Sequence, residues 1–251
     1  QDSGIQADHP DFFDRNGVTR VQQLNWYTAS GIAGTQDANF YEDYDGHGTH
    51  CASIAAGLKY GWAKAAHIYA QKLAGLEGTT DPGNGISIGN AFDAIRLWHN
   101  AKTDPTNAAY TGRPTVVNMS WGYSANLTAD PSSGNYRGSA WVWNPGEFQQ
   151  GYDSRSGLWS STGVVDKIFG TGTTFTIMPV RVASVDAEID DMIAAGIHVT
   201  IAAGNNLFKH DIPTGDDYDN TVVFSGTTYN YHRGSSPHSD DAGTYIVGNI
   251  D

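Results

Sequence analysis

Three short segments of the chain carry side chains that could act together in acid–base chemistry. Asp2 begins the sequence Asp-Ser-Gly, His47 lies within Gly-His-Gly-Thr-His, and Asn205 follows Ala-Ala-Gly. A carboxylate bonded to one imidazole nitrogen fixes the tautomer of the ring and stabilises the imidazolium that forms when the other nitrogen takes a proton. An amide N–H can stabilise negative charge that develops on a substrate oxygen. If the fold brings Asp2 and His47 together, these residue types can carry out proton transfer.

The hydrophobic pattern predicts the elements that hold these side chains. Helical spacing over residues 46–56 puts His47 in a first turn, and Gly57 can supply a left-handed C-terminal cap. Further helical patterns cover residues 86–101 and 187–195, and apolar runs of strand length cover residues 67–73, 115–119, 197–203 and 245–250. Strands that alternate with amphipathic helices predict a parallel sheet with right-handed crossovers. Ligands gather at the carboxyl ends of such strands, where Asp2, Ser120 and Asn205 are expected to lie.

Four motifs follow one another along the chain. They are Asp-Ser-Gly at 2–4, Asp-Gly-His-Gly-Thr-His-Cys-Ala at 45–52, Val-Asn-Met-Ser-Trp-Gly at 117–122 and Ala-Ala-Gly-Asn at 202–205. In this order they resemble the subtilisin-like serine peptidases, and His-Gly-Thr-His-Cys-Ala is close to the variant of the proteinase K branch. The resemblance covers nearly the whole chain except residues 123–183 and parts of 227–243.

The resemblance implies an α/β fold with three layers, α/β/α, around a mostly parallel twisted sheet. Residues 1–251 are expected to be one subtilisin-like peptidase domain, incomplete at both ends, because the chain starts and stops within strand-like sequence. Within it, residues 123–183 show no sustained period, which predicts an irregular insertion over the surface that is rich in tryptophan (Trp141, Trp143 and Trp159).

The resemblance also implies a role for each motif. Asp2 would be the orienting acid, His47 the general base, and Asn205 the side-chain donor to the oxyanion of a tetrahedral intermediate. An extended polypeptide substrate would pair its backbone with a strand formed by Ser120, Trp121 and Gly122. The pocket for the side chain before the cleaved bond would be lined by Ala202, Ala203 and Gly204.

The sequence departs from the family in one respect, the nucleophile. The family places its serine in a Gly-Thr-Ser turn, whereas Gly-Thr occurs here at residues 34, 48, 78, 170, 172, 226 and 243 and is never followed by Ser. The nearest imitation, Gly-Ser-Ser-Pro at 234–237, precedes the last predicted strand and has its proline in the wrong place. The retention of the acid, base and amide favours a serine on a missing C-terminal segment outside these 251 residues.

Other functions stay open beside the peptidase. In one alternative the serine is lost, and the domain is a catalytically dead module that binds extended peptides or builds an assembly such as a virion. In another, the Trp-rich insertion makes the protein a noncatalytic binder of carbohydrate or protein. A Gly-Thr-Ser sequence downstream of residue 251 would distinguish the enzyme from both.

Several candidate residues also have a simpler structural interpretation. His47 and His50 could form a two-histidine metal pair, but their spacing lacks a carboxylate ligand motif. His50 is expected to be a packed, hydrogen-bonded helix residue. Asp45 is expected to stabilise the positive end of the helix dipole. Cys51 could be a nucleophile, but a small buried thiol is the favoured interpretation.

No cofactor is expected for catalysis. Members of the family commonly bind structural calcium in surface loops, and the acidic pairs at residues 42–43 and 216–217 have the right chemistry. Clustered carboxylates are usually solvated, however, so these pairs are expected to face water and no metal ligand is named.

Composition restricts the partners. The chain has 14 Lys and Arg against 27 Asp and Glu, a net charge of −13, which argues against nucleic acid or an anionic membrane as partner. It has no run of about 18 apolar residues, so no membrane-spanning helix is expected. A low charged fraction of 16% and 30 glycines predict a loop-rich domain that works outside the cytosol, extracellular or secreted. Residues 180–206 also resemble subtilisin-like domains of large tailed bacteriophages. This resemblance would make the protein virion-associated.

Overall fold

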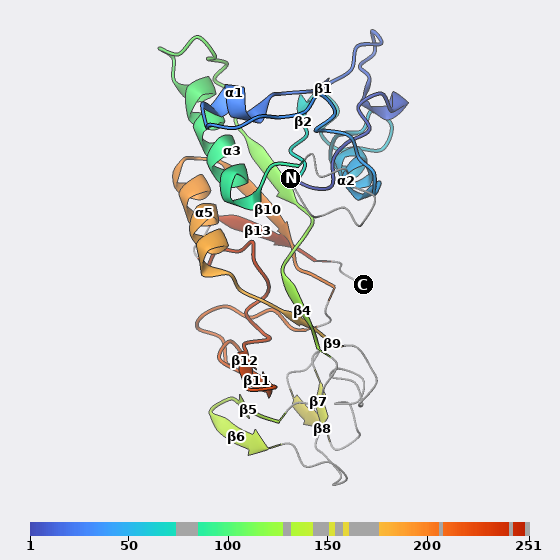
Figure 1. Ribbon diagram of the computed structural model, residues 1–251. Coiled ribbons are helices and arrows are strands. Elements are labelled where there is room, and N and C mark those ends of the chain that lie inside the picture. The colour runs from blue at the N-terminus through green and yellow to red at the C-terminus, as the bar shows by residue number, and fades with distance from the viewer. Residues whose placement is uncertain are drawn as a thin grey trace. The chain divides into compact units, whose positions relative to one another are not determined.

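The computed structural model describes residues 1–73, 85–127, 132–142, 151–153, 158–160, 176–205, 208–240 and 243–248 (Figure 1). The chain divides into two compact units. The first comprises Gln1–Ser120 with Asp190–Thr200, and the second comprises Trp121–Ile189 with Ile201–Asp251. Two elements, α5 (Ala183–Ala194) and β10 (His198–Ala202), cross the division.

The first unit combines short helices with short parallel strands. Its elements are η1 (Pro10–Phe12), β1 (Val21–Gln22), α1 (Trp26–Ser30), α2 (His47–Ala56), β2 (Ile68–Tyr69), α3 (Ile88–Thr103) and β3 (Val116–Met119). Strand β1 pairs with β2 in parallel, and α1 packs on α3 through an edge contact between the rings of Trp26 and Trp98 at 5.5 Å. The core beneath the N-terminal segment contains Ile5, Phe12 and Val21.

Two backbone pairings in the first unit position the segments that carry candidate residues. Asp2 forms a parallel bridge with Lys72, and its carbonyl accepts the Leu73 N–H at 3.0 Å. Strand β10 begins beside β3, where the His198 N–H donates to the Thr115 carbonyl at 3.0 Å. The predicted strands at 67–73, 115–119 and 197–203 are therefore present, although the first is regular only over β2.

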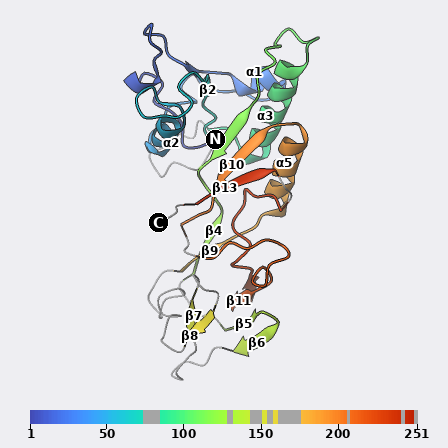
Figure 2. The ribbon, with the colours of Figure 1, turned by 180° about the vertical axis from the view of Figure 1, so that it is seen from behind.

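The second unit is built mainly from antiparallel strands. They are β4 (Ser124–Leu127), β5 (Ser133–Tyr136), β6 (Ser139–Val142), β7 (Gly151–Asp153), β8 (Leu158–Ser160), β9 (Thr176–Pro179), β11 (Thr221–Phe224), β12 (Thr227–Tyr229) and β13 (Thr244–Val247). Strand β4 pairs with β9, β7 pairs with β8, and a four-stranded sheet has the order β12-β11-β5-β6. Figure 2 shows these strands from behind. Strand β13 lies beside the end of β10, where the Ala203 N–H donates to the Val247 carbonyl at 3.0 Å.

The described part of residues 123–183 contains six strands, so the expectation of an irregular segment is wrong there. Strand β5 has the sequence Ser-Gly-Asn-Tyr, which lacks the alternation of apolar and polar residues by which a strand is recognised. Backbone pairing with β6 and β11 holds it instead. Trp143 lies outside the described residues, and the side chains of Trp141 and Trp159 are likewise not described.

The C-terminal end of α2 also differs from expectation. The cap residue Gly57 is extended (φ −59°, ψ 146°) and not left-handed, and its N–H donates to the Ser53 carbonyl at 2.8 Å. Glycine is needed here for space, because a Cβ atom at Gly57 would lie 2.5 Å from the backbone carbonyl oxygen of Ser53. Among the described residues, none of the helices combines the length and apolar character needed to cross a bilayer.

Candidate active site

Helix α2 begins at His47 because the preceding residues supply its missing hydrogen-bond partners. Gly46, the N-cap, adopts a left-handed conformation (φ 94°) that favours glycine and has no side chain to cap the helix. Asp43 takes this role instead, since its Oδ1 accepts the Gly46 N–H at 2.8 Å and its Oδ2 accepts the Thr49 N–H at 2.8 Å. The His47 ring therefore projects from a well-capped first turn.

His47 forms a close pair with Asp2. The His47 Nδ1 lies 2.7 Å from Asp2 Oδ1, which also accepts the Ser3 N–H at 2.8 Å. The His47 side chain is 48% exposed and that of Asp2 11%. The hydrogen bond to Asp2 raises the pKa of His47 above its ordinary value against the opposing effect of burial, and the charges of Asp2, Asp45 and Asp43 add to it. The arrangement stabilises an imidazolium while half of the ring stays accessible.

Two glycines allow the helix to approach the N-terminal segment closely enough for this bond. A Cβ atom at Gly48 would collide with the Gly4 carbonyl and lie 3.2 Å from the Asp2 Cβ. Gly4 itself has a positive φ of 131°, and a Cβ there would lie 2.5 Å from the Glu42 carbonyl oxygen. The glycines on both sides of the pair are therefore required by close backbone contact.

Cys51 lies close to the pair and contacts Ser120. The Cys51 Sγ is 3.8 Å from His47 Nδ1, and its thiol is hydrogen-bonded to Ser120. Burial raises the pKa of Cys51, and the bond to Ser120 offsets this only partly. Ser120 Oγ also accepts from Asn118 Nδ2 at 2.9 Å. Cys51 is therefore a protonated thiol beside the base that is only half-buried, not the buried thiol that was expected.

The structure corrects two other expectations about α2. His50 is exposed, so it is not a packed helix residue. Asp43 is not merely solvated, because both of its oxygens accept hydrogen bonds. Asp45 was expected to stabilise the N-terminal end of the helix, and its Oδ1 does accept the His47 N–H there at 3.3 Å. Sequence reasoning missed Asp43 as the cap, although an aspartate shortly before a helical pattern is a recognisable signal.

Two of the carboxylates considered for calcium, Asp43 and Asp217, are held by protein groups. Asp217 is fully buried, with Arg137 Nε 2.7 Å from one oxygen and Lys209 Nζ 2.6 Å from the other. Two cations at this distance neutralise the carboxylate, so Asp217 does not fit a calcium site. Among the described residues, Asp2, His47 and Cys51 are the one group of three whose ligand atoms lie within 4.8 Å of one another.

The remaining predicted site residues belong to the second unit. Gly122 and Asn205 are exposed, and Gly204 has a positive φ of 86°. The structure thus brings Asp2 and His47 together, with Ser120 in the same unit, while the roles of Trp121, Gly122 and residues 202–205 stay predictions.

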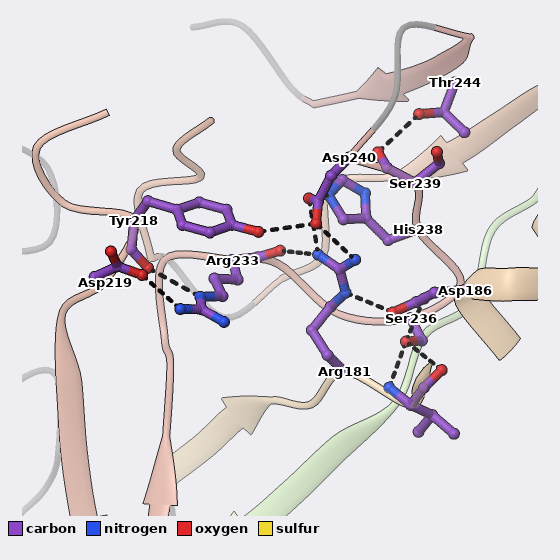
Figure 3. Close-up of polar contacts among 11 residues, drawn as sticks. Arg181, Asp186, Tyr218, Asp219, Arg233, Ser236, His238, Ser239, Asp240 and Thr244 are labelled. Carbon is purple, nitrogen blue, oxygen red and sulfur yellow. Dashed lines mark hydrogen bonds and ion pairs between the residues drawn. The ribbon is translucent and has the colours of Figure 1, made fainter. Parts of the chain in front are cut away.

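Ser236, in the Gly-Ser-Ser-Pro imitation of the nucleophile turn, is not available for chemistry. Its side chain is fully buried. Its Oγ donates to Asp186 Oδ1 at 2.6 Å and accepts the Val182 N–H at 2.6 Å (Figure 3). A hydroxyl that is buried and satisfied in both directions cannot attack a substrate, so Ser236 is not a nucleophile.

Comparison with known proteins decides the family. The model of the Subtilase family matches residues 1–242. This chain belongs to the subtilase family. The resemblance seen in the motifs and the α/β subtilisin-like fold are thereby confirmed.

Curated relatives of this subtilase include subtilisin-like serine proteases from fungi and a bacterium. Cur l 4.0101 of Cochliobolus lunatus is 30% identical over 134 residues, which is 51% of this chain and 23% of the relative. The protein pepC of Aspergillus niger is 32% identical over 133 residues, 51% of this chain and 22% of the relative. PopC of Myxococcus xanthus is 30% identical over 122 residues, 49% of this chain and 23% of the relative. The aligned regions thus span about a quarter of these relatives.

Proposed function

We propose that this subtilase is the acid–base part of a serine endopeptidase whose nucleophilic serine lies on polypeptide outside the 251 residues. The observation that carries the proposal is the 2.7 Å contact between His47 Nδ1 and Asp2 Oδ1, with the His47 pKa raised by that bond. A carboxylate on Nδ1 leaves Nε2 as the nitrogen that takes the proton of a serine hydroxyl.

In this mechanism His47 Nε2 accepts the serine proton as the serine oxygen attacks the scissile carbonyl. The resulting imidazolium is stabilised by Asp2, which stays ionised, and then protonates the leaving amine. Water repeats the cycle to release the acyl group. Asn205 would donate to the oxyanion; loss of one such donor lowers kcat about 10²–10³-fold, a magnitude known from subtilisin itself.

Substrate binding is proposed for the other motif residues. An extended peptide would add its backbone along Ser120, Trp121 and Gly122, and residues 202–204 would line the pocket for the side chain before the scissile bond. The polypeptide substrate and an extracellular location belong to this proposal, and the curated relatives, all subtilisin-like proteases by name, support its enzymatic part.

A fluorophosphonate probe tests the proposal because it labels only an activated serine. We expect no labelling of the 251-residue chain, and labelling of a longer natural polypeptide that includes a Gly-Thr-Ser turn. His47→Ala in the longer polypeptide should abolish that labelling. Labelling of the short chain, or a longer polypeptide without a reactive serine, would overturn the proposal.

A further inference from the structure

The Asp43 carboxylate is the meeting point of more hydrogen bonds than a helix cap needs. Its Oδ1 accepts from Ser3 Oγ at 2.9 Å, from the Asp45 N–H at 3.2 Å and from the Gly46 N–H at 2.8 Å. Its Oδ2 accepts from the Thr49 N–H at 2.8 Å and from Thr49 Oγ1 at 2.5 Å. The carboxylate as a whole therefore joins two separate segments of the chain, the one that contains Ser3 and the one that runs into helix α2.

These donors stand next to both members of the catalytic pair. Ser3 directly follows Asp2, Gly46 directly precedes His47, and Thr49 follows His47 by two residues. We propose that Asp43 is a positioning residue, which sets the contact between Asp2 and His47 by tying the backbones that carry them to one carboxylate. The catalytic consequence of this inference rests on the proposed function.

Two further bonds close the connection between the segments. Ser3 Oγ, which donates to Asp43, also accepts the Gly48 N–H at 2.9 Å. Thr49 Oγ1 likewise accepts the Gln6 N–H at 2.9 Å while it donates to Asp43. The N-terminal segment and helix α2 are thus joined by a continuous hydrogen-bonded network with Asp43 at its centre.

The loop that carries Asp43 is itself anchored. The ammonium group of Lys72, a residue that is only 1% exposed, donates to the Glu42 carbonyl at 3.0 Å. Lys72 also forms the parallel bridge with Asp2. The strand beside Asp2 therefore holds the residue before Asp43, and the carboxylate has little freedom to move away from the pair.

Asp43 stays ionised in this environment. Burial alone would raise its pKa, but the hydrogen bonds from Thr49, Gly46 and Ser3 outweigh it and lower the pKa below the ordinary value. An ionised carboxylate accepts on both oxygens, as the network requires. A misplacement of about 1 Å in a catalytic pair is enough to cost activity, so a rigid support has a functional consequence.

A role of Asp43 through its charge alone must be separated from positioning. Asp43 could act only through its charge, because its field also raises the pKa of His47. The other charged groups that raise the pKa of the ring are Asp2 and Asp45. Of the two nearby acids, Asp45 contributes more by charge than Asp43, so Asp45→Asn is a matched control for the field alone.

The experiment is an NMR titration of the His47 imidazole in the 251-residue chain. In Asp43→Asn we expect the His47 pKa to fall toward that of free histidine by more than in Asp45→Asn. Ser3→Ala, which removes no charge, should also lower it. A fall in Asp43→Asn no larger than in Asp45→Asn, together with an unchanged value in Ser3→Ala, would overturn the inference.

Further variants separate positioning from general stability. Thr49→Val loses the hydroxyl donor and should lower the His47 pKa, whereas Thr49→Ser keeps the donor and should restore it. Asp104→Asn removes a similar carboxylate that accepts from the N–H and Oγ1 of Thr106 far along the chain, and should leave the His47 pKa unchanged. Equal effects of Thr49→Val and Thr49→Ser would count against positioning.

The titration needs no peptidase activity, so it can succeed where the proposed function fails. In a longer polypeptide that reacts with fluorophosphonate, Ser3→Ala should lower kcat with little change in KM, because the substrate contacts remain. If no serine reacts but the His47 pKa still responds as described, the positioning role stands and the peptidase proposal falls.

Discussion

Each unit of this subtilase contains a histidine in contact with an aspartate, and the two pairs have opposite properties. His47 Nδ1 lies 2.7 Å from Asp2, and its pKa is raised. His238 Nε2 lies 3.3 Å from Asp240, and its pKa is lowered to about 4, first by burial and then by the charge of Arg181. The same two residue types thus yield a readily protonated base in one unit and, in the other, a ring that is neutral at neutral pH.

The difference lies in what else binds the carboxylate and how exposed the ring is. Asp240 also accepts from Arg181 at 3.3 Å and from the Tyr218 hydroxyl at 2.8 Å (Figure 3). The His238 side chain is 6% exposed, against 48% for His47. A carboxylate already neutralised by arginine cannot stabilise an imidazolium in a buried place. A contact between a histidine and an aspartate therefore indicates a general base only when no cationic side chain is bound to the same aspartate.

The largest expected effect follows from breaking the first pair. Asp2→Asn, made in a longer polypeptide that carries the reactive serine, should lower kcat about 10⁴-fold, because the ring loses its tautomer and its imidazolium stabilisation. Asp240→Asn removes the matching acid of the second unit and should leave kcat nearly unchanged. Steady-state hydrolysis of a peptide substrate measures both. Equal losses in the two variants would refute the distinction between the pairs.

The first pair could be predicted from the sequence and the second could not, and the reason is physical. Asp2 and His47 lie in motifs whose residues are dictated by backbone contact, such as Gly4 and Gly48, so the sequence around them is distinctive. Helices α2 and α3 of the first unit also show helical spacing of their apolar residues in the sequence. His238 stands in a turn-rich stretch, and its environment depends on Arg181, which is remote along the chain.

The same reasoning explains what was missed inside the site. The cap of α2 comes from Asp43, four residues before the helix, and not from the residue at its start. Local pattern indicates that an acid belongs near a helix N-terminus, but not that its second partner is Ser3. Bonds between distant segments, like the β5–β11 pairing, leave no periodic signal in the sequence.

The second prediction concerns Arg181, because this cation binds the acid of the second histidine–aspartate pair and makes it differ from the first. Its Nε lies 2.7 Å from Asp186, and its guanidinium also contacts Asp240. Arg181→Met leaves Asp186, whose side chain is 14% exposed, without its cation, and Asp240, which is 40% exposed, loses a weaker contact. The variant should therefore cost about 3 kcal/mol in the free energy of unfolding, the lower end of the range for a buried pair. It should also raise the pKa of His238, because a repelling charge is removed.

Urea unfolding and a histidine NMR titration check both parts of this prediction. Arg233→Met is the matched control, since its partner Asp219 is 82% exposed and such pairs contribute about 1 kcal/mol or less. If Arg181→Met destabilises the protein no more than Arg233→Met, or leaves the His238 pKa at its low value, the account of the second pair is wrong.

The third prediction concerns acid stability, where the two histidines have opposite signs. Because the folded-state pKa of His238 is about 4, below that of free histidine, the unfolded state binds more protons between about pH 6.5 and 4. Stability is therefore lost as the pH falls through this window, by up to about 3 kcal/mol. His47 has a raised pKa, so its contribution is present at low pH and is lost as the pH rises through the folded-state value.

Replacement of each histidine by glutamine makes this contrast measurable. His238→Gln should reduce the fall in Tm between pH 7 and pH 4.5, and His47→Gln should increase it slightly. Thermal unfolding followed by circular dichroism across this range compares the variants with the parent chain. Parallel changes in the two variants would show that the pKa shifts do not have opposite signs.

The smallest effect is expected from Cys51, although its sulfur lies 3.8 Å from the proposed base. A cysteine that serves as a nucleophile beside histidine needs a lowered pKa, whereas burial raises the pKa of Cys51. Cys51→Ala should therefore change kcat only about twofold to threefold, the loss of one packing contact of about 0.5 kcal/mol. Alkylation of the thiol by iodoacetamide should be slow at pH 7. It should accelerate only when the pH rises above the pKa of a free cysteine. Fast alkylation at neutral pH would contradict this prediction, as would a loss of kcat in Cys51→Ala as large as that in Asp2→Asn. Either result would mean that His47 accepts the proton of the Cys51 thiol instead of that of an external serine.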